Sequence, residues 1–306
     1  MKVIVTGGAG FIASHITDVL AENGYEVCVI DSLTKGKRSN VNLKAMLHVV
    51  DITDAKKLDD VFAREKPLFV IHHAAQINIR TSIENPAEDM RHNILGTLNI
   101  LECCKKHGVK KIVFASSGGA VYGEPIKLPC NENHPTNPIC PYGIAKLAAE
   151  YYIKFYGIIH GINYTILRYS NVYGPRQNAK GEAGVISIFS DKMLNGEEVS
   201  IFGDGEQTRD FVYVKDVAQA NLLALKNGAN KIINIGTGKQ TSVNQLYKEM
   251  NALIKKGKMK HTLSVAGEVR HSYLDITLAK KELGWEPKTM IREGLKKTVK
   301  WFEKEN

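Results

Sequence analysis

The feature that most constrains this chain is a glycine-rich turn, Gly8-x-Gly10-x-x-Ala13, between its first apolar run and its first helical pattern. Glycines there permit a tight turn and let backbone N–H groups approach a pyrophosphate at the positive end of a helix. The sequence has 26 glycines, so the pattern alone is weak and its position carries the argument. The next apolar run ends at Asp31, where a carboxylate can accept hydrogen bonds from ribose hydroxyls. The sequence therefore predicts a dinucleotide-binding fold.

Short apolar runs alternate with helical patterns through the first half of the chain. This alternation predicts a parallel sheet with helices on both faces, and the runs have the Val, Ile and Phe content of strands buried on both sides. The predicted fold class is α/β: a doubly wound parallel sheet of the Rossmann type with a smaller mixed α/β substrate-binding domain. The predicted strands are Lys2–Thr6, Glu26–Ile30, Leu47–Val50, Leu68–His72, Lys111–Ala115 and Ile162–Leu167, and the predicted helices are Phe11–Asn23, Ala55–Arg64, Pro86–Lys106 and Pro141–Tyr156.

The length of 306 residues is about twice that of a typical domain. After about residue 171 the pattern is less regular, with shorter elements separated by Pro and Gly. We predict a dinucleotide-binding domain over residues 1–170 and a smaller substrate domain over residues 171–306. Val212–Leu225 and Lys231–Ile235 are regular enough to rejoin the sheet. Residues 211–240 are therefore expected to return to the first domain, so that the two domains interleave.

Asp31 also bears on which dinucleotide is bound. Its negative charge would repel the 2′-phosphate of NADP, which favours NAD. The nearby Lys35, Lys37 and Arg38 could accommodate a phosphate, although such a basic cluster is more often a solvated loop. Asp51 follows the third predicted strand. It either meets the adenine amino group or caps the following helix, and the sequence leaves both interpretations open.

A tyrosine and a lysine provide the candidate catalytic pair. Tyr142 and Lys146 lie four residues apart and so share one face of the helix that begins at Pro141. A cation on that face lowers the pKa of the phenol and supports a phenolate that acts as a base. Ser116 and Ser117 end a predicted strand, at the edge where doubly wound sheets bind ligands. A serine there can hydrogen-bond the same substrate oxygen that Tyr142 deprotonates.

The charge balance indicates an anionic partner. A total of 41 Lys and Arg against 32 Asp and Glu gives a net charge of +9, which suits nucleic acid, a membrane surface or a phosphorylated small molecule. No basic run alternates with aromatic residues as in single-strand binders, and no apolar run approaches the ~20 residues of a membrane span. We expect neither nucleic acid nor a membrane as a partner.

The five cysteines are odd in number and show no paired metal-ligand spacing. This pattern argues against a disulfide scaffold, fits a reducing compartment, and predicts no metal site. The sequence runs from Met1 directly into a predicted strand without a charged leader or a cleavage site. We therefore expect a cytoplasmic protein.

The motifs and their order closely resemble the extended short-chain dehydrogenase/reductase family, and within it the UDP-glucose 4-epimerases. So many short motifs in one order are highly specific for the family and less specific for the sugar. The resemblance extends from Lys2 to about Phe302 and rests on Thr6–Ile12, Asp31, His73–Gln76, Asn93, Ser116–Gly123, Tyr142–Lys146, Leu167–Arg176, Ile201–Gly205, Thr208–Val212, Asn234–Gly238 and Leu283–Pro287.

The resemblance implies an NAD-dependent epimerase that interconverts UDP-glucose and UDP-galactose. Tyr142 would take the proton of the sugar 4-hydroxyl while hydride passes from C4 to tightly held NAD. The 4-keto sugar would then turn about its diphosphate and take the hydride back on its other face. Lys146 would hold the nicotinamide ribose. By the same resemblance, the cofactor-binding residues are Gly7, Gly10, Phe11, Ile12, Asp31, Lys35, Asp51, Ile52, Ala74, Gln76, Asn93, Ser116, Tyr142, Lys146 and Tyr169.

The resemblance also implies a set of substrate-binding residues. Asn171, Arg209 and Arg270 match positions that hold the diphosphate, and Phe202 and Glu268 match the nucleoside end. Arginine suits this work because its planar fork pairs with phosphate oxygens. The implied set comprises Asn171, Val185, Phe202, Arg209, Val243, Glu268 and Arg270.

Two positions depart from the family pattern. Ala13 replaces the usual third glycine, where a methyl group is tolerated because only helix–strand packing is at stake. Counting back from Val121-Tyr122-Gly123 places Gly118 at the position of the family's catalytic serine or threonine, whereas counting back from Tyr142 favours Ser117. We predict Ser117, with Ser116 as the alternative and a water molecule as the third option.

Related activities compete with this interpretation. Similar dehydratases carry an Asp-Glu pair where Gly118-Gly119 stands here, which argues against a dehydratase or a decarboxylase. A UDP-glucuronate 4-epimerase stays open because Arg80 and Arg176 could meet a carboxylate. A non-catalytic NAD-sensing Rossmann protein is the distant alternative, against which the Tyr142–Lys146 pair argues.

Two further expectations come from the resemblance. Ser272 falls where some family members have a bulky tyrosine that limits the sugar pocket, so we expect the N-acetylhexosamine pair to be accepted as well. Family members often dimerise through the helices that correspond to Pro86–Lys106 and Tyr142–Tyr156. We therefore expect a homodimer.

Overall fold

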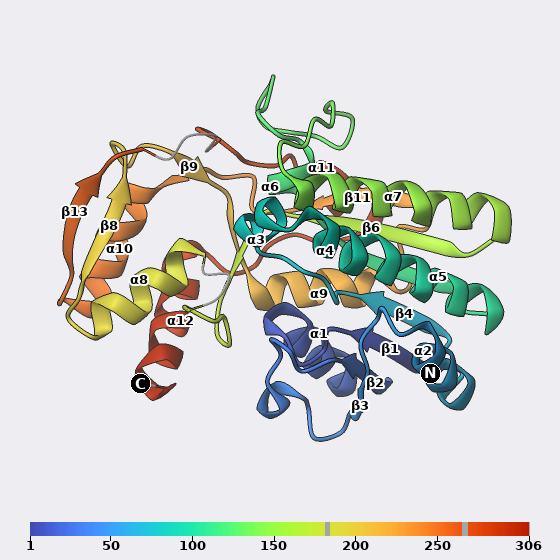
Figure 1. Cartoon of the computed structure of the whole chain (residues 1–306). Coiled ribbons are helices and arrows are strands. Elements are labelled where there is room, and N and C mark those ends of the chain that lie inside the picture. Colours follow the sequence, from blue (N-terminus) through green and yellow to red (C-terminus); the bar gives the residue numbers. More distant parts are fainter. Residues whose placement is uncertain (181–183, 265–268, 306) are drawn as a thin grey trace.

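A computed structural model describes residues 1–180, 184–264 and 269–305, and its central feature is one sheet of seven parallel strands (Figure 1). The strand order β11–β6–β5–β4–β1–β2–β3 is that of a doubly wound sheet and confirms the predicted fold class. The strands are β1 (Lys2–Thr6), β2 (Glu26–Asp31), β3 (Met46–Val49), β4 (Phe69–His72), β5 (Lys111–Ser117), β6 (Asn163–Tyr169) and β11 (Lys231–Ile235).

Helices cover both faces of this sheet. Along β1, Val3 and Val5 are buried in one core and Ile4 in the other, as the alternation of side chains along a strand requires. This double burial explains why the strands read as apolar runs rather than as alternating patterns. One face carries α1 (Phe11–Glu22), α9 (Val214–Ala224) and α11 (Thr277–Leu283), and the other carries α2 (Ala55–Glu65), α5 (Gly96–Lys106) and α7 (Pro141–His160).

The helix predicted over Pro86–Lys106 is continuous but not uniform. It consists of α4 (Pro86–Met90), a π-helical turn η2 (Arg91–Leu95) and α5. Wider turns of this kind are frequent at functional sites. Here the turn carries Asn93, whose side-chain Nδ2 donates a 2.8 Å hydrogen bond to the carbonyl oxygen of Gln76. A short preceding helix, α3 (Ile79–Glu84), was not predicted.

A second group of elements lies beside the large sheet, on the left in Figure 1. Its strands form three pairs: β7 (Asn171–Tyr173) with β10 (Phe211–Tyr213), β8 (Glu198–Phe202) with β13 (Lys258–Thr262), and β9 (Thr208–Arg209) with β12 (Thr241–Ser242). Its helices share a core with these strands and are α8 (Val185–Leu194), α10 (Val243–Ile254) and α12 (Ile291–Glu305).

The return of the chain to the large sheet is narrower than predicted. Lys231–Ile235 joins it as β11, beside β6. The prediction that Val212–Leu225 rejoins the sheet is wrong for its strand, because Phe211 and Tyr213 place their rings in the core of the second group and β10 pairs with β7. The helix that follows, α9, does cover the large sheet. Among the described residues no helix has the length and apolar content to cross a membrane.

The carboxyl ends of the parallel strands bring the predicted site residues to one edge. The glycine-rich turn follows β1, Asp31 ends β2, and Ser117 ends β5. Between β1 and β4 the connections leave the sheet toward opposite faces, because α1 covers one face and α5 the other. Ligands of doubly wound folds bind at such a switch point.

Candidate active site and cofactor site

The predicted catalytic pair lies on the first turns of α7, beside the end of β5. The Nζ atom of Lys146 is 5.8 Å from the centroid of the Tyr142 ring. It also donates a 2.9 Å hydrogen bond to the carbonyl oxygen of Ala115. Lys146 is only 4% exposed, whereas Tyr142 is half-buried. The lysine is thus held inside the protein, while the tyrosine beside it is partly exposed to solvent.

Two neighbouring helices fix the start of α7. Pro141 occupies its first turn, where the missing N–H costs nothing. A Cβ atom on Gly143 would lie 2.7 Å from the carbonyl oxygen of Ala120, so glycine is required for α6 (Gly118–Val121) to pack this closely. The backbone N–H of Tyr142 donates a 3.3 Å hydrogen bond to Ser82 Oγ of α3.

The charge on Lys146 depends on its surroundings. Burial lowers the pKa of Lys146 to about 8, and the negative charges of Asp89 and Glu150 oppose that effect. An ammonium with this pKa remains mostly charged at neutral pH. Its charge favours the phenolate form of Tyr142, which is the form that acts as a base.

The two serines at the end of β5 differ in their contacts. Ser116 Oγ donates a hydrogen bond to Glu150 Oε1, and the other carboxylate oxygen of Glu150 pairs with Arg168 at 2.6 Å inside the protein. Ser117 faces the opposite side of the strand, is half-buried, and immediately precedes α6. These contacts favour Ser117 over Ser116 as a hydroxyl that faces the substrate.

The glycine-rich turn leaves the N-terminus of α1 open. Gly7 has φ +71°, and a Cβ atom there would lie 2.8 Å from the backbone nitrogen of Ala74. Gly10 is the N-cap, and α1, all of whose residues are described, has neither a side-chain cap nor an acidic residue in its first turn. The first N–H groups of the helix, at Phe11 and Ile12, are therefore available to a phosphate. The turn fits the pyrophosphate of a dinucleotide.

Asp31 is built into this turn. Its Oδ2 accepts a 3.0 Å hydrogen bond from the backbone N–H of Ala9, and its Oδ1 accepts one of 2.8 Å from Leu33. The carboxylate thus holds the glycine-rich turn and the loop after β2 together. Lys35 lies exposed on that loop.

Asp51 does not cap helix α2, which was one of the two roles that the sequence left open. Its Oδ1 accepts hydrogen bonds of 2.8 Å from both the backbone N–H and the hydroxyl of Thr53. The cap of α2 is Asp54, which accepts a hydrogen bond from the backbone N–H of Lys57. The helix-cap interpretation of Asp51 is therefore wrong. The next residue, Ile52, is buried.

Threonine and histidine side chains hold the loop after β4 against the glycine-rich turn. Thr6 Oγ1 lies 2.7 Å from His72 Nδ1 and accepts hydrogen bonds of 3.1 Å from the backbone N–H groups of His73 and Ala74. Tyr169 Oη lies 3.2 Å from His73 Nε2. Burial lowers the pKa of His73 to about 3, so its ring is neutral. Ala74 and Tyr169 are thus brought to the predicted cofactor edge.

Asp89 is a buried acid, not predicted from the sequence, that orients two predicted cofactor residues. Its Oδ1 accepts hydrogen bonds from Gln76 Nε2 at 2.8 Å and from Asn93 Nδ2 at 3.0 Å. Its Oδ2 is buried with no hydrogen-bond partner among the described residues, and burial raises the pKa of the carboxyl. The one indication of this role in the sequence is that Asp89 precedes Asn93 by four residues, which places both side chains on one face of a helix.

Most of the predicted substrate residues are joined by backbone contacts in the second group of elements. The N–H of Thr208 donates to the carbonyl oxygen of Arg270 at 3.0 Å, and the N–H of Val243 donates to that of Gln207 at 3.2 Å. Gln207 Nε2 in turn donates to the carbonyl oxygen of Phe202 at 3.0 Å. The residues connected in this way are Phe202, Arg209, Val243 and Arg270.

The Arg270 side chain forms an ion pair of its own, and Asn171 and Val185 begin separate elements. Arg270 is exposed and forms two hydrogen bonds of 2.7 Å with the carboxylate of Asp204. Asn171 begins β7, with an exposed side chain, and Val185 begins α8. Glu268 lies outside the described residues.

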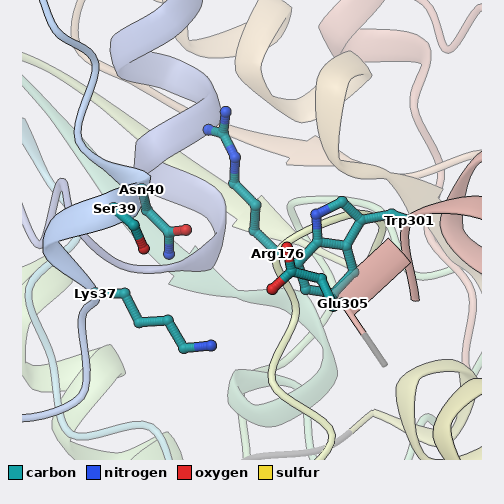
Figure 2. Close-up of a pocket in the computed structure, with 6 residues that line it drawn as sticks. All are labelled: Lys37, Ser39, Asn40, Arg176, Trp301 and Glu305. Carbon is teal, nitrogen blue, oxygen red and sulfur yellow. The ribbon is translucent and has the colours of Figure 1, made fainter. Parts of the chain in front are cut away.

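A pocket shown in Figure 2 lies apart from the catalytic pair. It is lined by Lys37, Ser39, Asn40, Arg176, Trp301 and Glu305. Arg176 Nη1 donates a 2.8 Å hydrogen bond to Asp18 of α1. A guanidinium has five N–H donors, so this pairing does not by itself prevent Arg176 from meeting a carboxylate.

With a Tyr–Lys pair at the same sheet edge as the glycine-rich turn, the protein has the fold and site of a dinucleotide-dependent enzyme. Residues 3–236 match the NAD dependent epimerase/dehydratase family. The chain belongs to this family, which confirms the resemblance seen in its sequence and the choice of NAD.

Relatives match the chain over its full length. A protein of Methanocaldococcus jannaschii named putative UDP-glucose 4-epimerase is 55% identical over 99% of both chains. The crystal structure of the Thermotoga maritima UDP-glucose 4-epimerase with UDP-glucose has a TM-score of 0.98 and 50% identity, covering 100% of this chain and 99% of that one. The Thermus thermophilus UDP-glucose 4-epimerase complex with NAD has a TM-score of 0.94 and 40% identity, covering 99% of each chain.

Replacing Gly7 by alanine tests the cofactor site. We expect Gly7→Ala to bind NAD at least about tenfold more weakly, a change of about 1.4 kcal/mol, because the added Cβ meets the backbone at Ala74. Gly24→Ala is the matched control, since Gly24 has φ +77° and nothing within 4 Å of the added atom. Calorimetric titration of NAD-free protein measures both affinities. Equal NAD affinities in the two variants would contradict the assignment.

Proposed function

We propose that the protein is an epimerase that interconverts UDP-glucose and UDP-galactose through a transient 4-keto sugar. The observation that carries this proposal is the buried Lys146 ammonium beside Tyr142, at the sheet edge where the glycine-rich turn lies. The names of the full-length relatives support the same reaction. NAD, when bound, supplies reversible hydride exchange with C4 of the sugar.

In this proposal the side chains of the protein transfer one proton, that of the sugar 4-hydroxyl. Tyr142 takes the proton of the 4-hydroxyl and returns it to the product, so that a single base serves both directions. Lys146 holds the positive charge that makes the phenolate accessible near neutral pH. Ser117 donates a hydrogen bond to the same sugar oxygen. Asp89 acts as a positioning residue, because it orients the side-chain amides of Gln76 and Asn93.

The diphosphate would be held by the second group of elements. Arg209 lies on β9, and Arg270 is attached to the same strand through Thr208. Arg270 is paired with Asp204 in this structure, but a guanidinium has five N–H donors and can serve a phosphate at the same time. Two arginines and Asn171 provide the positive charge and the hydrogen-bond donors that a diphosphate with two negative charges requires.

The alternatives differ in the support that they receive. A dehydratase or decarboxylase would need an acid after the catalytic hydroxyl, and Gly118 and Gly119 begin α6 there instead. A UDP-glucuronate 4-epimerase would need a cation for the carboxylate. Arg176 lines a pocket whose lining includes neither Tyr142 nor Lys146, whereas Arg80 lies exposed on α3 next to α7. A non-catalytic NAD-sensing role could use Lys146 to hold the cofactor, but it gives no role to Tyr142, the base beside it.

A tyrosine-to-phenylalanine pair tests the reaction. Wild-type protein mixed with UDP-galactose is expected to yield UDP-glucose, and Tyr142→Phe is expected to lower kcat by about 10²–10⁴-fold because it removes the acid–base group. The control is Tyr151→Phe, an exposed tyrosine of the same helix. No interconversion by the wild type, or full activity in Tyr142→Phe, would refute the mechanism.

The sugar pocket is expected to accept N-acetylhexosamines as well. The backbone N–H of Ser272 donates a 3.2 Å hydrogen bond to Thr208, beside Arg209, and its side chain is small. We expect the wild type to epimerise UDP-N-acetylglucosamine and Ser272→Tyr to lose this activity while keeping UDP-galactose turnover. Ser272→Ala controls for loss of the hydroxyl. A wild type that turns over UDP-galactose but not UDP-N-acetylglucosamine would contradict this expectation.

We further propose that the protein is cytoplasmic, because the free thiols of its five buried cysteines would persist in that reducing compartment.

We also propose a homodimer formed through α5 and α7. The two helices contact each other along one side of the sheet (Figure 1). Large apolar side chains on α7 are exposed at helical spacing, so they form a stripe on the face away from the core. A second copy around a two-fold axis would cover the same stripe on each chain. The stripe consists of Ile144, Tyr151, Tyr152, Phe155, Ile158 and Ile159.

A charge in this stripe should separate the subunits. Ile158→Glu is expected to shift the protein from dimer to monomer in sedimentation equilibrium, because it buries a carboxylate in an apolar interface. Ile126→Glu is the control, since Ile126 is 82% exposed and Ile158 is 80% exposed, but Ile126 lies in a loop outside the stripe. A monomeric wild type, or a dimeric Ile158→Glu protein, would overturn the assignment.

A further inference from the structure

Three potential metal ligands meet on the α2 side of the sheet, among residues that the proposed reaction does not use. They are Cys28 of β2, His48 of β3 and Glu65 at the end of α2. Their ligand atoms all lie within 4.8 Å of one another. Because the three residues are far apart in sequence, no spacing pattern could reveal them.

The geometry of the cluster is close to that of a zinc site. Cys28 Sγ lies 3.2 Å from Glu65 Oε2, and His48 Nε2 lies 2.9 Å from Glu65 Oε1. Tetrahedral zinc, with bonds of about 2.3 Å to sulfur and about 2.0–2.1 Å to nitrogen and oxygen, separates its ligand atoms by roughly 3.3–3.6 Å. Small side-chain rotations would therefore open the cluster enough to admit the ion.

Lys2 provides the positive charge of the cluster without metal. Its Nζ is 3.0 Å from Glu65 Oε2 and 2.7 Å from Glu26 Oε1. When Glu65 binds a metal, Lys2 can remain paired with Glu26. The Glu26 side chain is largely exposed, so it can move together with Lys2. A divalent ion with the Cys28 thiolate and the Glu65 carboxylate is neutral, and so is the remaining Lys2–Glu26 pair. Without metal, the single positive charge of Lys2 faces the two carboxylates of Glu26 and Glu65, so the cluster carries a net charge of −1 that zinc binding brings to zero.

The site is buried on one side and accessible on the other. Cys28 and Glu65 are buried, whereas the His48 side chain is 11% exposed. His48 also lines a surface hollow between β3 and α2, together with Lys57, Asp60 and Arg64. The hollow gives an ion a path to the ligands and leaves room for water as the fourth ligand.

We propose that Cys28, His48 and Glu65 form a zinc site, open to water at its fourth position, that crosslinks β2, β3 and α2. Binding replaces the S–H bond of Cys28 by a sulfur–zinc bond and releases the proton to solvent, without any change of oxidation state. Burial, with the hydrogen bond to Glu65, raises the pKa of the Cys28 thiol to about 12, so the proton is present at neutral pH before binding.

Cobalt serves as the probe, because Co²⁺ replaces zinc and its thiolate complexes absorb light. The full chain, stripped by a chelator, is titrated with Co²⁺ and then with Zn²⁺. We expect one equivalent to give thiolate–cobalt absorption and intense tetrahedral visible bands, both removed by zinc. Cys28→Ser and His48→Gln should weaken binding by more than about 100-fold, the upper range for losing an outer-shell partner. Cys103→Ser, at another buried free cysteine, should bind like the wild type.

The results that would overturn the site are equally direct. No thiolate–cobalt absorption in the wild type, or the same absorption in Cys28→Ser or His48→Gln, would refute it. If Cys28→Ser does not fold, as judged by circular dichroism, His48→Gln alone decides. Epimerisation of UDP-galactose is measured on stripped and zinc-loaded protein and should be equal. Failure of that reaction in both forms would count against the proposed function and leave the zinc result unaffected.

Discussion

The active-site geometry depends on polar contacts that fix helix α7 to the sheet. Lys146 is tied to the carbonyl oxygen of Ala115 on β5, and Glu150, one turn further along, binds Ser116 of β5 and Arg168 of β6. Breaking the buried Glu150–Arg168 pair costs about 3–5 kcal/mol, so α7 has one register on the strands. Tyr142, on the same helix, takes its position from these contacts. The apolar core alone would tolerate small shifts that a proton transfer would not.

Features governed by local rules could be predicted from the sequence. The strands of the large sheet were recognisable because residues such as Val3, Ile4 and Val5 are buried on both faces. The glycine-rich turn was recognisable because φ +71° at Gly7 and the nearby backbone exclude a side chain. Helical spacing brought Tyr142 and Lys146 to one face. The family and NAD follow from these features together with the order of the motifs.

Features that depend on contacts between distant segments could not be predicted in this way. Ser116 and Ser117 can be told apart only in the structure, where the Ser116 hydroxyl donates a hydrogen bond to Glu150. Asp89 matters through Gln76, on another segment, and its own sequence context shows only helical spacing. The strand β10 leaves the large sheet because its aromatic rings fill a core formed by segments on both sides of it in the sequence, from Tyr173 to Val299. The extent of the two domains stays a prediction for the same reason, since their segments alternate along the chain.

Two lysines, the buried Lys146 on α7 and the partly exposed Lys2 on β1, show how surroundings decide what a charge does. Burial lowers the pKa of Lys146 to about 8, with Asp89 and Glu150 limiting the effect, so its proton is held loosely and its field acts on the Tyr142 ring. The hydrogen bonds that Lys2 donates to Glu26 and Glu65 raise the pKa of its ammonium, so its proton is held throughout the physiological range. The first arrangement suits a group that tunes proton transfer, and the second suits a static crosslink. A metal at the Lys2 cluster would therefore have to displace a firmly held ammonium, and only a ligand set containing a thiolate would favour zinc enough to do so.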